Sequence, residues 1–306
     1  MKFLSSLIFC ILLGAEATAQ SKKFNFIAFG DMPYKLPEDY GRFEGVIKKI
    51  NQEKPVFSVH VGDIKSGSTP CSTEYFYKII QYFESFEQPL IYTPGDNEWT
   101  DCHRKGAGEY DANERLRELR KVFFAKKESF GKKKIKLVSQ SENPAFANYV
   151  ENNAWEYGGI QFATIHLVGS NNNLKAGNAD NTEFNERERA NEAWLEEVFA
   201  KASNKKGLVF FTQADMFYHG AVPTGFTQIV EKLSALTRAY GKPVLWINGD
   251  SHRLIIEKPL LMPDKKSTLL NFTRLQVFGE ADMETVRVIV DPKSSQLFLF
   301  EQLMVD

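Results

Sequence analysis

The chain has 306 residues, enough for one large domain or two small ones. Apolar residues make up 43% of the chain and charged residues 25%, which is ordinary for a globular protein. The net charge is −1, so no overall positive field would recruit nucleic acid or an anionic membrane. Composition therefore gives no indication of a nucleic-acid partner, and the function has to be read from local motifs.

The N-terminal residues have the pattern of a secretory signal. Lys2 gives a positive start, Phe3–Gly14 is apolar but too short to span a bilayer comfortably, and Ala17–Ala19 fits a small-residue cleavage site. An N-terminal membrane anchor is the alternative, and the polar residues that follow argue against it. We predict a signal peptide over residues 1–19, a single domain over residues 20–306, a secreted or periplasmic location, and no integral membrane segment after signal removal.

The first half of the chain alternates strand and helix patterns. Apolar runs predict strands at Phe24–Phe29, Val56–Val61 and Leu90–Tyr92, and helical periodicity predicts helices over Glu38–Asn51 and Ser72–Phe86. This β-α-β-α-β order indicates a parallel sheet with right-handed crossovers. Asp111, with Glu114 three residues later, is expected to cap a further helix.

Strand patterns dominate the middle and the end of the chain. Two more helices are predicted over Glu183–Ser203 and from a Thr224 cap to Tyr240. The last three strands are expected to form an antiparallel sheet. The predicted strands of this half are Phe146–Val150, Trp155–Tyr157, Ile160–Val168, Leu208–Phe211, Val244–Ile247, Leu269–Val277, Thr285–Val290 and Gln296–Leu303. The expected fold is α/β in class, a four-layer αββα sandwich of two mixed β-sheets flanked by helices.

Four Gly-Asp pairs each follow one of the apolar runs. Their carboxylates are Asp31, Asp63, Asp96 and Asp250. Side chains just past the carboxyl ends of strands lie where open α/β sheets bind ligands. Carboxylates that meet there repel one another unless a cation lies among them, and hard divalent cations prefer oxygen ligands. Gly-Asp is also a common turn dipeptide, but four pairs after four apolar runs favour a metal site.

The two cysteines of the expected mature chain follow two of these pairs. Cys71 comes after Asp63, and Cys102 comes after Asp96. If the two preceding strands are neighbours, the cysteines can meet in an oxidising compartment. We predict a disulfide between Cys71 and Cys102 that joins two loops of the site, with two free thiols as the alternative.

The order of these motifs resembles that of the calcineurin-like metallophosphoesterases. That family has Asp-x-His, Gly-Asp, Gly-Asn-His-Asp/Glu, a lone His after a strand, and Gly-His-x-His. The corresponding segments here are Asp31-Met32-Pro33, Gly62-Asp63, Gly95-Asp96-Asn97-Glu98, Gln213 and Gly249-Asp250-Ser251-His252. The resemblance covers nearly the whole mature chain. It implies the αββα sandwich and a single calcineurin-like phosphoesterase domain over residues 20–306.

The resemblance implies a set of metal ligands that is only partly kept. Asp31, Asp63 and His252 agree with the family, and Asp63 would be the bridging carboxylate. Pro33 cannot bind a metal through its side chain, and Gln213 stands in place of a His. The implied ligands are Asp31, Asp63, Asp96, Gln213, Asp250 and His252. Because carboxylate oxygen suits Mg and Mn whereas imidazole suits Zn and Fe, we expect one or two divalent ions, Mg or Mn in preference to Zn or Fe.

The implied activity is hydrolysis of a phosphate mono- or diester by a metal-bound hydroxide, with a small phosphorylated substrate. Asn97 stands where the family has its catalytic His, and it can donate a hydrogen bond to a phosphoryl oxygen but cannot act as an acid. His103 and Arg104, on the same loop, are candidates for the acid and for a phosphate clamp. The alternative for this pair is an exposed loop tip beside the disulfide.

Two other functions remain open. The altered motif positions are compatible with a secreted protein that keeps the fold and a metal, binds a ligand or partner, and does not turn over phosphoesters. Aspartyl-phosphate chemistry at Asp31 is disfavoured because the following Met-Pro-Tyr lacks a second carboxylate.

Tyr34, Trp99, Tyr218 and Asn171–Asn173 follow strand ends and are predicted pocket lining, whereas His60 and His166 are expected to be hydrogen-bonded core residues.

Overall fold

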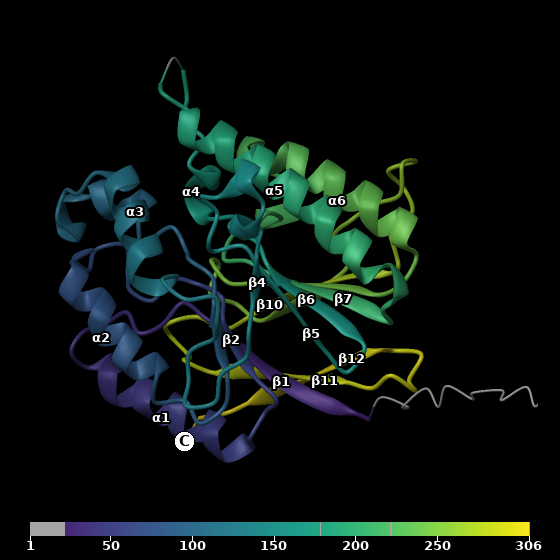
Figure 1. Ribbon diagram of the computed structural model, residues 1–306, viewed down its shortest axis with the longest axis horizontal. Helices are drawn as coiled ribbons and strands as arrows, with labels where there is room; N and C mark the ends of the chain where they lie inside the picture. The colour runs from purple at the N-terminus through teal and green to yellow at the C-terminus, as the bar shows by residue number, and fades with distance from the viewer. Residues whose placement is uncertain (1–21, 178, 221, 306) are drawn as a thin grey trace, which may run out of the picture.

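The computed structural model describes residues 22–177, 179–220 and 222–305 (Figure 1). The predicted signal peptide, residues 1–19, lies outside the described residues. Within the described ranges, no helix has the length and apolar character needed to cross a membrane.

Two mixed β-sheets form the centre of the molecule. The five-stranded sheet has the order β12-β11-β1-β2-β3. In it β1, β2 and β3 are parallel, and β11 pairs antiparallel with both β1 and β12. Its strands are β1 (Phe24–Phe29), β2 (Ser58–His60), β3 (Leu90–Tyr92), β11 (Thr285–Val290) and β12 (Phe298–Leu303).

The seven-stranded sheet has the order β4-β5-β6-β7-β8-β10-β9. Its four central strands β6, β7, β8 and β10 are parallel, and the outer strands pair antiparallel. Its strands are β4 (Val138–Ser139), β5 (Asn153–Tyr157), β6 (Ile160–Thr164), β7 (Gly207–Phe211), β8 (Val244–Asn248), β9 (Ile255–Glu257) and β10 (Phe272–Gln276).

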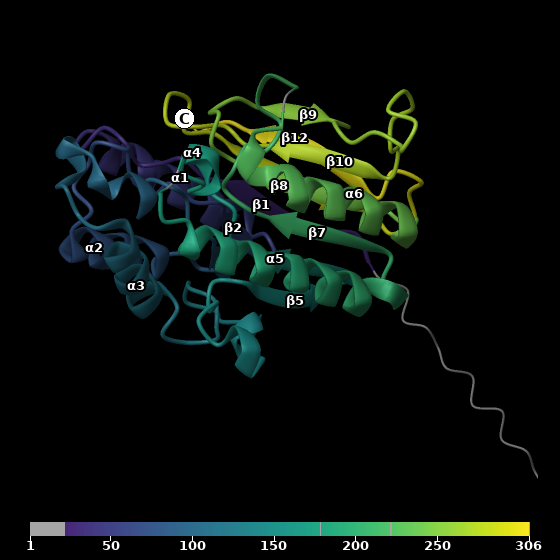
Figure 2. The same ribbon diagram turned by 90° about the horizontal axis from the view of Figure 1, so that it is seen from above.

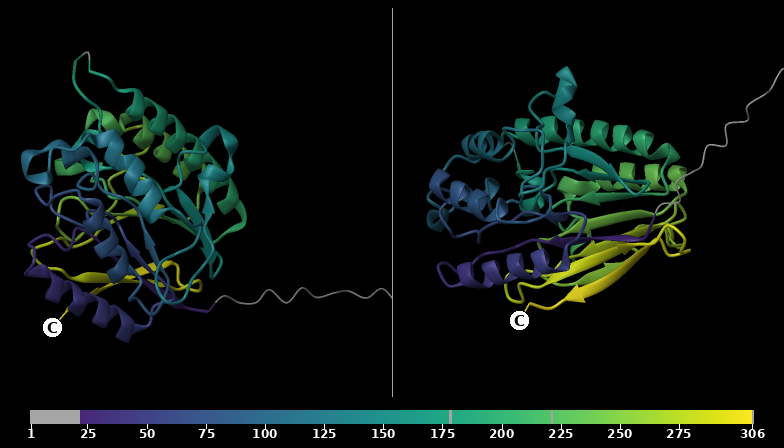
Figure 3. Two further views of the ribbon diagram at one scale, coloured as in Figure 1. Left: turned by 60° about the vertical axis from the view of Figure 1, so that its left-hand side comes forward. Right: turned by 60° about the horizontal axis from the view of Figure 1, so that its bottom comes forward.

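Helices cover the outer face of each sheet (Figures 1 and 3). Helices α1 (Asp39–Glu53), α2 (Thr73–Phe83) and α3 (Ala112–Phe123) pack on the five-stranded sheet. Helices α5 (Thr182–Lys201) and α6 (Thr227–Tyr240) lie side by side on the seven-stranded sheet (Figure 2). Asp111 caps α3 as predicted, because its side chain accepts a hydrogen bond from the Glu114 N–H.

Short segments complete the chain. The helical turn α4 (Gly169–Asn172) follows β6 and lies at the site described below. The 3-10 helices are η1 (Thr100–His103), η2 (Lys105–Ala107), η3 (Gln140–Glu142), η4 (Pro144–Phe146), η5 (Ala202–Asn204), η6 (Tyr218–Gly220) and η7 (Thr224–Phe226).

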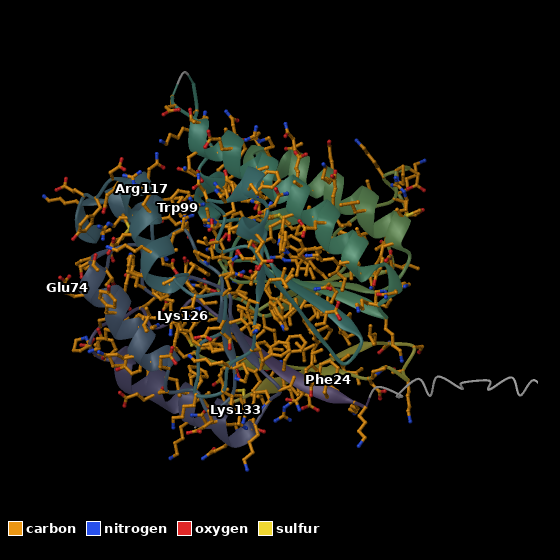
Figure 4. All side chains as sticks on the ribbon, in the orientation of Figure 1. Phe24, Glu74, Trp99, Arg117, Lys126 and Lys133 are labelled. Carbon is orange, nitrogen blue, oxygen red and sulfur yellow. A yellow bond between two sulfur atoms is a disulfide. The ribbon has the colours of Figure 1, made fainter. Side chains whose placement is uncertain are left out.

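The alternation of side chains along β1 shows why the layers form. Phe24, Phe26 and Ala28 lie in the core between the two sheets, whereas Ile27 and Phe29 lie in the core under α1 and α2. A strand with both faces buried carries apolar residues at nearly every position. Apolar side chains fill the interior, while Glu74 and Arg117 extend from the outer faces of their helices (Figure 4). The predicted four-layer αββα sandwich is confirmed.

Two details of the predicted elements are wrong. Phe146–Val150 is not a strand, because Pro144 begins the 3-10 helix η4 and the Asn143 side chain accepts a hydrogen bond from the Ala145 N–H. The predicted Thr224 cap is also wrong: Thr224 begins η7, and α6 starts at Thr227 without a side-chain cap.

The C-terminal strands are divided between the two sheets. β11 and β12 pair antiparallel as expected, but β10 lies in the seven-stranded sheet, parallel to β8. The prediction of one antiparallel sheet from the last three strands is therefore wrong. Side-chain alternation reports which faces of a strand are buried but not which strand lies beside it, so the pattern of β10 alone could not reveal this.

Candidate active site

Loops from both sheets meet at the carboxyl ends of the parallel strands. Asp31 follows β1 and Asp250 follows β8, and the Asp250 N–H donates to Asp31 Oδ1 at 3.0 Å. Gln213 follows β7, and its Nε2 donates to Asp63 Oδ2 at 3.2 Å and to Asp96 Oδ1 at 3.1 Å. The structure thus brings together residues that are far apart along the chain.

Asp63 is the centre of this cluster. Its Oδ2 accepts hydrogen bonds from the Tyr34 hydroxyl at 2.9 Å, from Asn97 Nδ2 at 2.9 Å and from Gln213 Nε2 at 3.2 Å. Its Oδ1 accepts from the Asn97 backbone N–H at 3.2 Å. These donors hold a buried carboxylate that has no direct ion-pair partner among the described residues, and bonds of this kind favour its charged form.

Gln213 is oriented by the loop after β6. Its Oε1 accepts a hydrogen bond from the Gly169 N–H at 2.6 Å, so its NH₂ group faces Asp63 and Asp96. The backbone donor determines which end of the amide points to the carboxylates, because an N–H needs an acceptor. In this orientation Gln213 supplies a donor to the cluster and not the neutral oxygen ligand that the sequence suggests.

A chain of polar contacts leads from the cluster to the surface. Ser170 Oγ lies 2.8 Å from Asp96 Oδ2 and 3.0 Å from Asp101 Oδ1. A hydroxyl has one proton, so it can donate to only one of the two at a time. Arg104 Nη2 lies 2.7 Å from Asp101 Oδ2 and is half exposed. Arg104 is therefore held at the rim by Asp101.

His252 and Asp250 approach Asp31 from the seven-stranded sheet. His252 Nε2 lies 3.5 Å from Asp31 Oδ1. The Asp250 carboxylate accepts a hydrogen bond from the Asp215 N–H at 2.9 Å. Burial lowers the pKa of His252, but the hydrogen bond to Asp31 and the negative charges around it, that of Asp31 foremost, outweigh burial, so that the pKa is raised above its ordinary value. His252 can therefore carry a positive charge that offsets part of the negative charge of the cluster.

The backbone is unusual at four of the predicted ligands. Asp31 has φ 53°, Asp63 φ 55°, Asp250 φ 78° and His252 φ 56°, all in the left-handed region. A non-glycine residue there is uncommon, and it persists only where surrounding contacts hold it. Such conformations concentrate at functional sites, so their presence at these four positions supports a functional role for the cluster.

The carboxylates are buried together, which disfavours their charged forms. Burial, followed by the charges of Asp96 and Glu98, raises the pKa of Asp63 well above its ordinary value. Burial and the charge of Asp96 raise the pKa of Asp250 to about 8. Burial also raises the pKa of Asp31. At neutral pH the cluster must therefore hold protons or be neutralised by a cation.

The chemistry of the donor set fits a hard divalent cation, since carboxylate oxygens dominate and a single imidazole accompanies them. Gly169 lies against these carboxylates. A Cβ at its position would lie 2.7 Å from Asp96 Oδ2 and 2.8 Å from Asp250 Oδ1, so both oxygens border the space beside the Gly169 Cα. Across the described ranges, however, no group of three or more His, Cys, Asp or Glu side chains is arranged as a metal site. Hydrogen bonds from Gln213 and its neighbours hold the carboxylate oxygens instead, so a metal would have to displace them.

The predicted catalytic and substrate-binding residues occupy different environments. Asn97 lies in the cluster, where its Nδ2 donates to Asp63 and, at 3.0 Å, to the Tyr34 hydroxyl oxygen. His103 is exposed, and its Nδ1 lies 2.7 Å from the Thr100 carbonyl oxygen. Asn97 is thus gathered with the carboxylates, while His103 and Arg104 lie on the rim.

The predicted disulfide between Cys71 and Cys102 is confirmed, with a Cα–Cα distance of 5.8 Å. It joins the loops after β2 and β3, and its two sulfurs lie 3.5 and 3.7 Å from the Asn97 carbonyl oxygen. Glu98 connects the same two loops, because its Oε1 accepts hydrogen bonds from the Ile64 N–H and the Tyr92 hydroxyl. Glu98 thus holds the loops after β2 and β3 together.

Sequence reasoning missed several members of the site. Tyr34 was expected only as pocket lining, yet its hydroxyl donates to Asp63. Lys65, two residues after Asp63, is fully buried, and burial lowers its pKa to about 8. Its position after a Gly-Asp pair was the available signal. Asp101 and Ser170 gave weaker signals, because a polar residue in a loop is ordinary.

Other predicted environments are clear. Trp99, labelled in Figure 4, is fully buried: it packs with Leu116 and Val168, and its ring centroid lies 5.5 Å from that of His166. It is not among the residues that line the cavity beside Asp250 and His252. His60 is a buried core residue that contacts the Met32 carbonyl, as predicted. His166 is likewise buried, with its Nδ1 2.8 Å from Glu151. Tyr218 and Asn171 do line a cavity beside Asp250 and His252.

No protein-family model matches the sequence, and no curated protein matches it. Solved structures do match. PhoD superimposes with a TM-score of 0.62 at 13% identity, over 90% of this chain and 65% of PhoD, so the chain spans less than two thirds of that protein. A dimetal phosphatase from Danio rerio has a TM-score of 0.51 at 9% identity, over 92% of this chain and 99% of the other. GAP50, the anchor in the inner membrane complex of Plasmodium, has a TM-score of 0.52 at 10% identity, over 93% of this chain and 90% of the other.

The chain has the fold of the calcineurin-like metallophosphoesterases. Identities of this size establish the fold and leave the chemistry to the residues. Within the metallophosphoesterase fold, Asp31, Asp63 and Asp96 come from the five-stranded sheet, whereas Gln213, Asp250 and His252 come from the seven-stranded sheet. The candidate site therefore lies between the two sheets, at the ends of their parallel strands.

Proposed function

We propose that this chain is a secreted, metal-dependent phosphoesterase that hydrolyses a small phosphate mono- or diester. The observation that carries the proposal is the convergence of strand-end carboxylates from both sheets: Asp31, Asp63 and Asp96 are buried, Asp250 is half-buried, and His252 lies beside them. Burial raises the pKa of Asp63 and of Asp250, and a divalent cation would remove the cost of keeping these groups ionised. The phosphatase of the same fold from Danio rerio is a dimetal enzyme, which supports the choice of cation.

The proposed ligands are connected by two sets of contacts. His252 and the Asp250 N–H contact Asp31, and Gln213 donates to Asp63 and to Asp96. One or two ions, Mg or Mn in preference to Zn or Fe, suit this oxygen-rich set. Bound there, a divalent cation would offset negative charge on the phosphoryl oxygens. Gln213 could contribute its oxygen only by giving up the hydrogen bond from the Gly169 N–H.

The chain's own polar groups would bind and orient the phosphate. The Asn97 amide, which now donates to Asp63 and Tyr34, could donate to a phosphoryl oxygen. Hydrolysis forms a bond from water oxygen to phosphorus and breaks the bond to the alcohol oxygen, which gains a proton. His103 is the proposed proton donor, and Arg104 the proposed phosphate contact, since its guanidinium is held near the site by Asp101.

The test is an assay of p-nitrophenyl phosphate and bis(p-nitrophenyl) phosphate with chelator-treated protein to which Mg, Mn, Ca or Zn is returned. Asp63→Asn should lower the metal-dependent rate by about a hundredfold or more, because removal of partners outside the ligand shell already costs 10- to 100-fold. The matched control is Asp291→Asn. Asp291 follows β11 and lies near the amino end of β1, at the opposite edge of the same sheet.

A second readout does not depend on turnover. Added Mg or Mn should raise the melting temperature of the chelator-treated protein and of Asp291→Asn, but have little effect on Asp63→Asn. Turnover that is unchanged by chelation, or by Asp63→Asn, would contradict the proposal. Stoichiometric Zn or Fe in the purified protein would contradict the preference for Mg or Mn.

A protein that binds a metal and a ligand without turnover is the second candidate. It is favoured by the hydrogen bonds that already satisfy Asp63 and by the replacement of the family's catalytic His by Asn97. GAP50 of Plasmodium, an anchor, has the same fold. Metal-dependent melting together with no hydrolysis of either ester would support this candidate over the enzyme.

Secretion is part of the proposal. The signal-like N-terminal sequence and the disulfide between Cys71 and Cys102 support it, because disulfides persist in oxidising compartments. Expression of the full chain in a bacterium with a periplasm should give a mature protein whose N-terminus is Gln20, measured by intact mass. A cytoplasmic product that retains residues 1–19 would contradict it.

A further inference from the structure

We propose that the substrate's alcohol is apolar and that it binds in a groove continuous with the active-site cavity. This inference rests on the proposed phosphoesterase function, and it names the class of substrate: phosphate esters of alcohols with an alkyl or aryl group. The groove is lined by side chains that the metal cluster does not use.

The active-site cavity is the starting point. It has a volume of about 640 Å³ and opens beside Asp250 and His252. Ser170 and Ser251 also line it, and aromatic residues, among them Phe217 and Tyr218, form part of its wall. A phosphate placed against the carboxylate cluster would therefore direct its alcohol into a space with aromatic walls.

A second cavity, of about 670 Å³, adjoins the first and shares Phe217 and Glu257 with it. We call it the apolar groove. Its apolar lining comes from the segment between β7 and α6 (Phe217 and Val222), from α6 (Val230), and from the segment between β9 and β10 (Leu260, Leu261 and Met262). Leu261 is 45% exposed although it is a large apolar side chain. Exposed apolar surface that is continuous with a polar cavity is typical of ligand-binding sites.

Three charged groups at the junction, Arg274, Asp215 and Glu257, are paired with one another, so they are not available to a charged alcohol. Arg274 lies 2.7 Å from Asp215 and 2.6 Å from Glu257. The Ser251 hydroxyl donates to the other oxygen of Asp215 at 2.6 Å. A charged alcohol would have to break these pairs, whereas an apolar one leaves them intact and removes apolar surface from water.

Glu231, Arg238 and Lys265 also line the groove, and all three are exposed to solvent. Each of the two cavities has the size of a small-molecule site, which usually lies between 300 and 1,000 Å³. Size and continuity with the carboxylate cluster favour the substrate itself as the occupant of the groove over a protein partner.

The test uses straight-chain alkylphosphonates from methyl to hexyl as non-hydrolysable competitors of p-nitrophenyl phosphate, in the presence of the activating metal. Each methylene that enters the groove should tighten inhibition by up to about fourfold, as expected from the transfer of a methylene out of water. Hexylphosphonate should therefore inhibit at least about tenfold more tightly than methylphosphonate.

The matched variants are Leu261→Asp and Leu270→Asp. Leu261 lines the groove, while Leu270 is 74% exposed and is not among the residues of the groove or the active-site cavity. Both are substantially exposed, so both variants should fold. Leu261→Asp should remove the dependence on chain length and leave methylphosphonate inhibition unchanged. Leu270→Asp should keep the dependence.

The outcomes separate this inference from the function on which it rests. Turnover with no dependence on chain length would overturn the apolar alcohol and leave the phosphoesterase standing. Absence of turnover, with hexylphosphonate binding more tightly than methylphosphonate by calorimetry, would overturn the enzyme and support the groove. A concentration-dependent dimer that Leu261→Asp alone disrupts would show that a second copy covers the groove, and would overturn the inference.

Discussion

The loops of the two sheets contribute differently to the candidate site. The loops after β1, β2 and β3 place Asp31, Asp63 and Asp96 in the interior, where they are almost fully buried. The loops after β6 and β8 supply Ser170, Asp250 and their neighbours, which line the open cavity. Among the residues that the structure describes, none that lines this cavity comes from the loops of the five-stranded sheet.

This difference separates two tasks. The five-stranded sheet concentrates negative charge and holds it rigidly, through the disulfide and through donors such as Tyr34 and Asn97. In the proposed enzyme the seven-stranded sheet would control access, because its loops line the cavity and lead to the apolar groove. Gln213 connects the two, since it belongs to the second set of loops and donates to carboxylates of the first. Changes in the first set should therefore affect stability and chemistry, and changes in the second should affect selectivity.

The largest expected effect on stability comes from removing the disulfide that joins the loops after β2 and β3. Cys71→Ser combined with Cys102→Ser opens a crosslink between residues separated by 31 positions, and the chain-entropy relation gives about 3–4 kcal/mol as an upper estimate. Urea unfolding of the oxidised protein and of the double variant should show this loss in the free energy of unfolding. Phosphoesterase activity should fall as well, because the Asn97 carbonyl packs on the two sulfurs. Equal stability would show that hydrogen bonds alone hold these loops.

An intermediate effect on stability is expected from replacing Gln213, which connects the loops of the two sheets. Gln213→Leu removes the donor to Asp63 and Asp96 and leaves the Gly169 N–H without its acceptor. Loss of buried hydrogen bonds to charged groups should lower the free energy of unfolding by about 2–3 kcal/mol in the presence of a chelator. Thermal denaturation of Gln213→Glu provides the comparison: its added carboxylate should destabilise the chelated protein further and make its melting more responsive to Mg. If neither variant changes stability, the hydrogen bonds from Gln213 to Asp63 and Asp96 do not form in solution.

The smallest expected effect is a pH dependence of the free energy of unfolding that comes from Glu188, near the loops that line the cavity. Glu188 on α5 accepts a hydrogen bond from Asn172, next to the cavity loop, and burial raises its pKa to about 7 despite the opposing charge of Arg187, with Glu192 adding to the rise. Because Glu188 has a higher pKa in the folded state than in the unfolded state, the folded state has its full stability below pH 4. Part of this stability is lost as the pH rises to about 7. Glu188→Gln should therefore be more stable than the parent at pH 8 by about 1–2 kcal/mol, with the difference shrinking toward pH 5. A constant difference across this range in urea unfolding would refute this assignment.

The sequence was most informative where a local rule applies to each residue. The apolar run of β1 followed by Gly30 and Asp31 predicts both a buried strand and a carboxylate at its end. The separation of Cys71 and Cys102 from their Gly-Asp pairs predicts a disulfide once β2 and β3 are neighbours, and the structure contains it. Pro144 shows the limit of such rules. The apolar residues after it suggest a strand, but Pro144 begins a 3-10 helix there.

Pattern and spacing alone thus predicted most of the strands, the outer helices, the four-layer architecture and the acidic residues at the strand ends, because each follows from periodicity or from a turn residue close in sequence. Only the tertiary structure decided that β10 inserts beside β8, that the Gln213 amide turns its nitrogen to Asp63, and that Tyr34 donates to the same carboxylate. The physical reason is that these contacts join residues from different elements. Their geometry depends on how the two sheets are placed against each other, which no local pattern encodes.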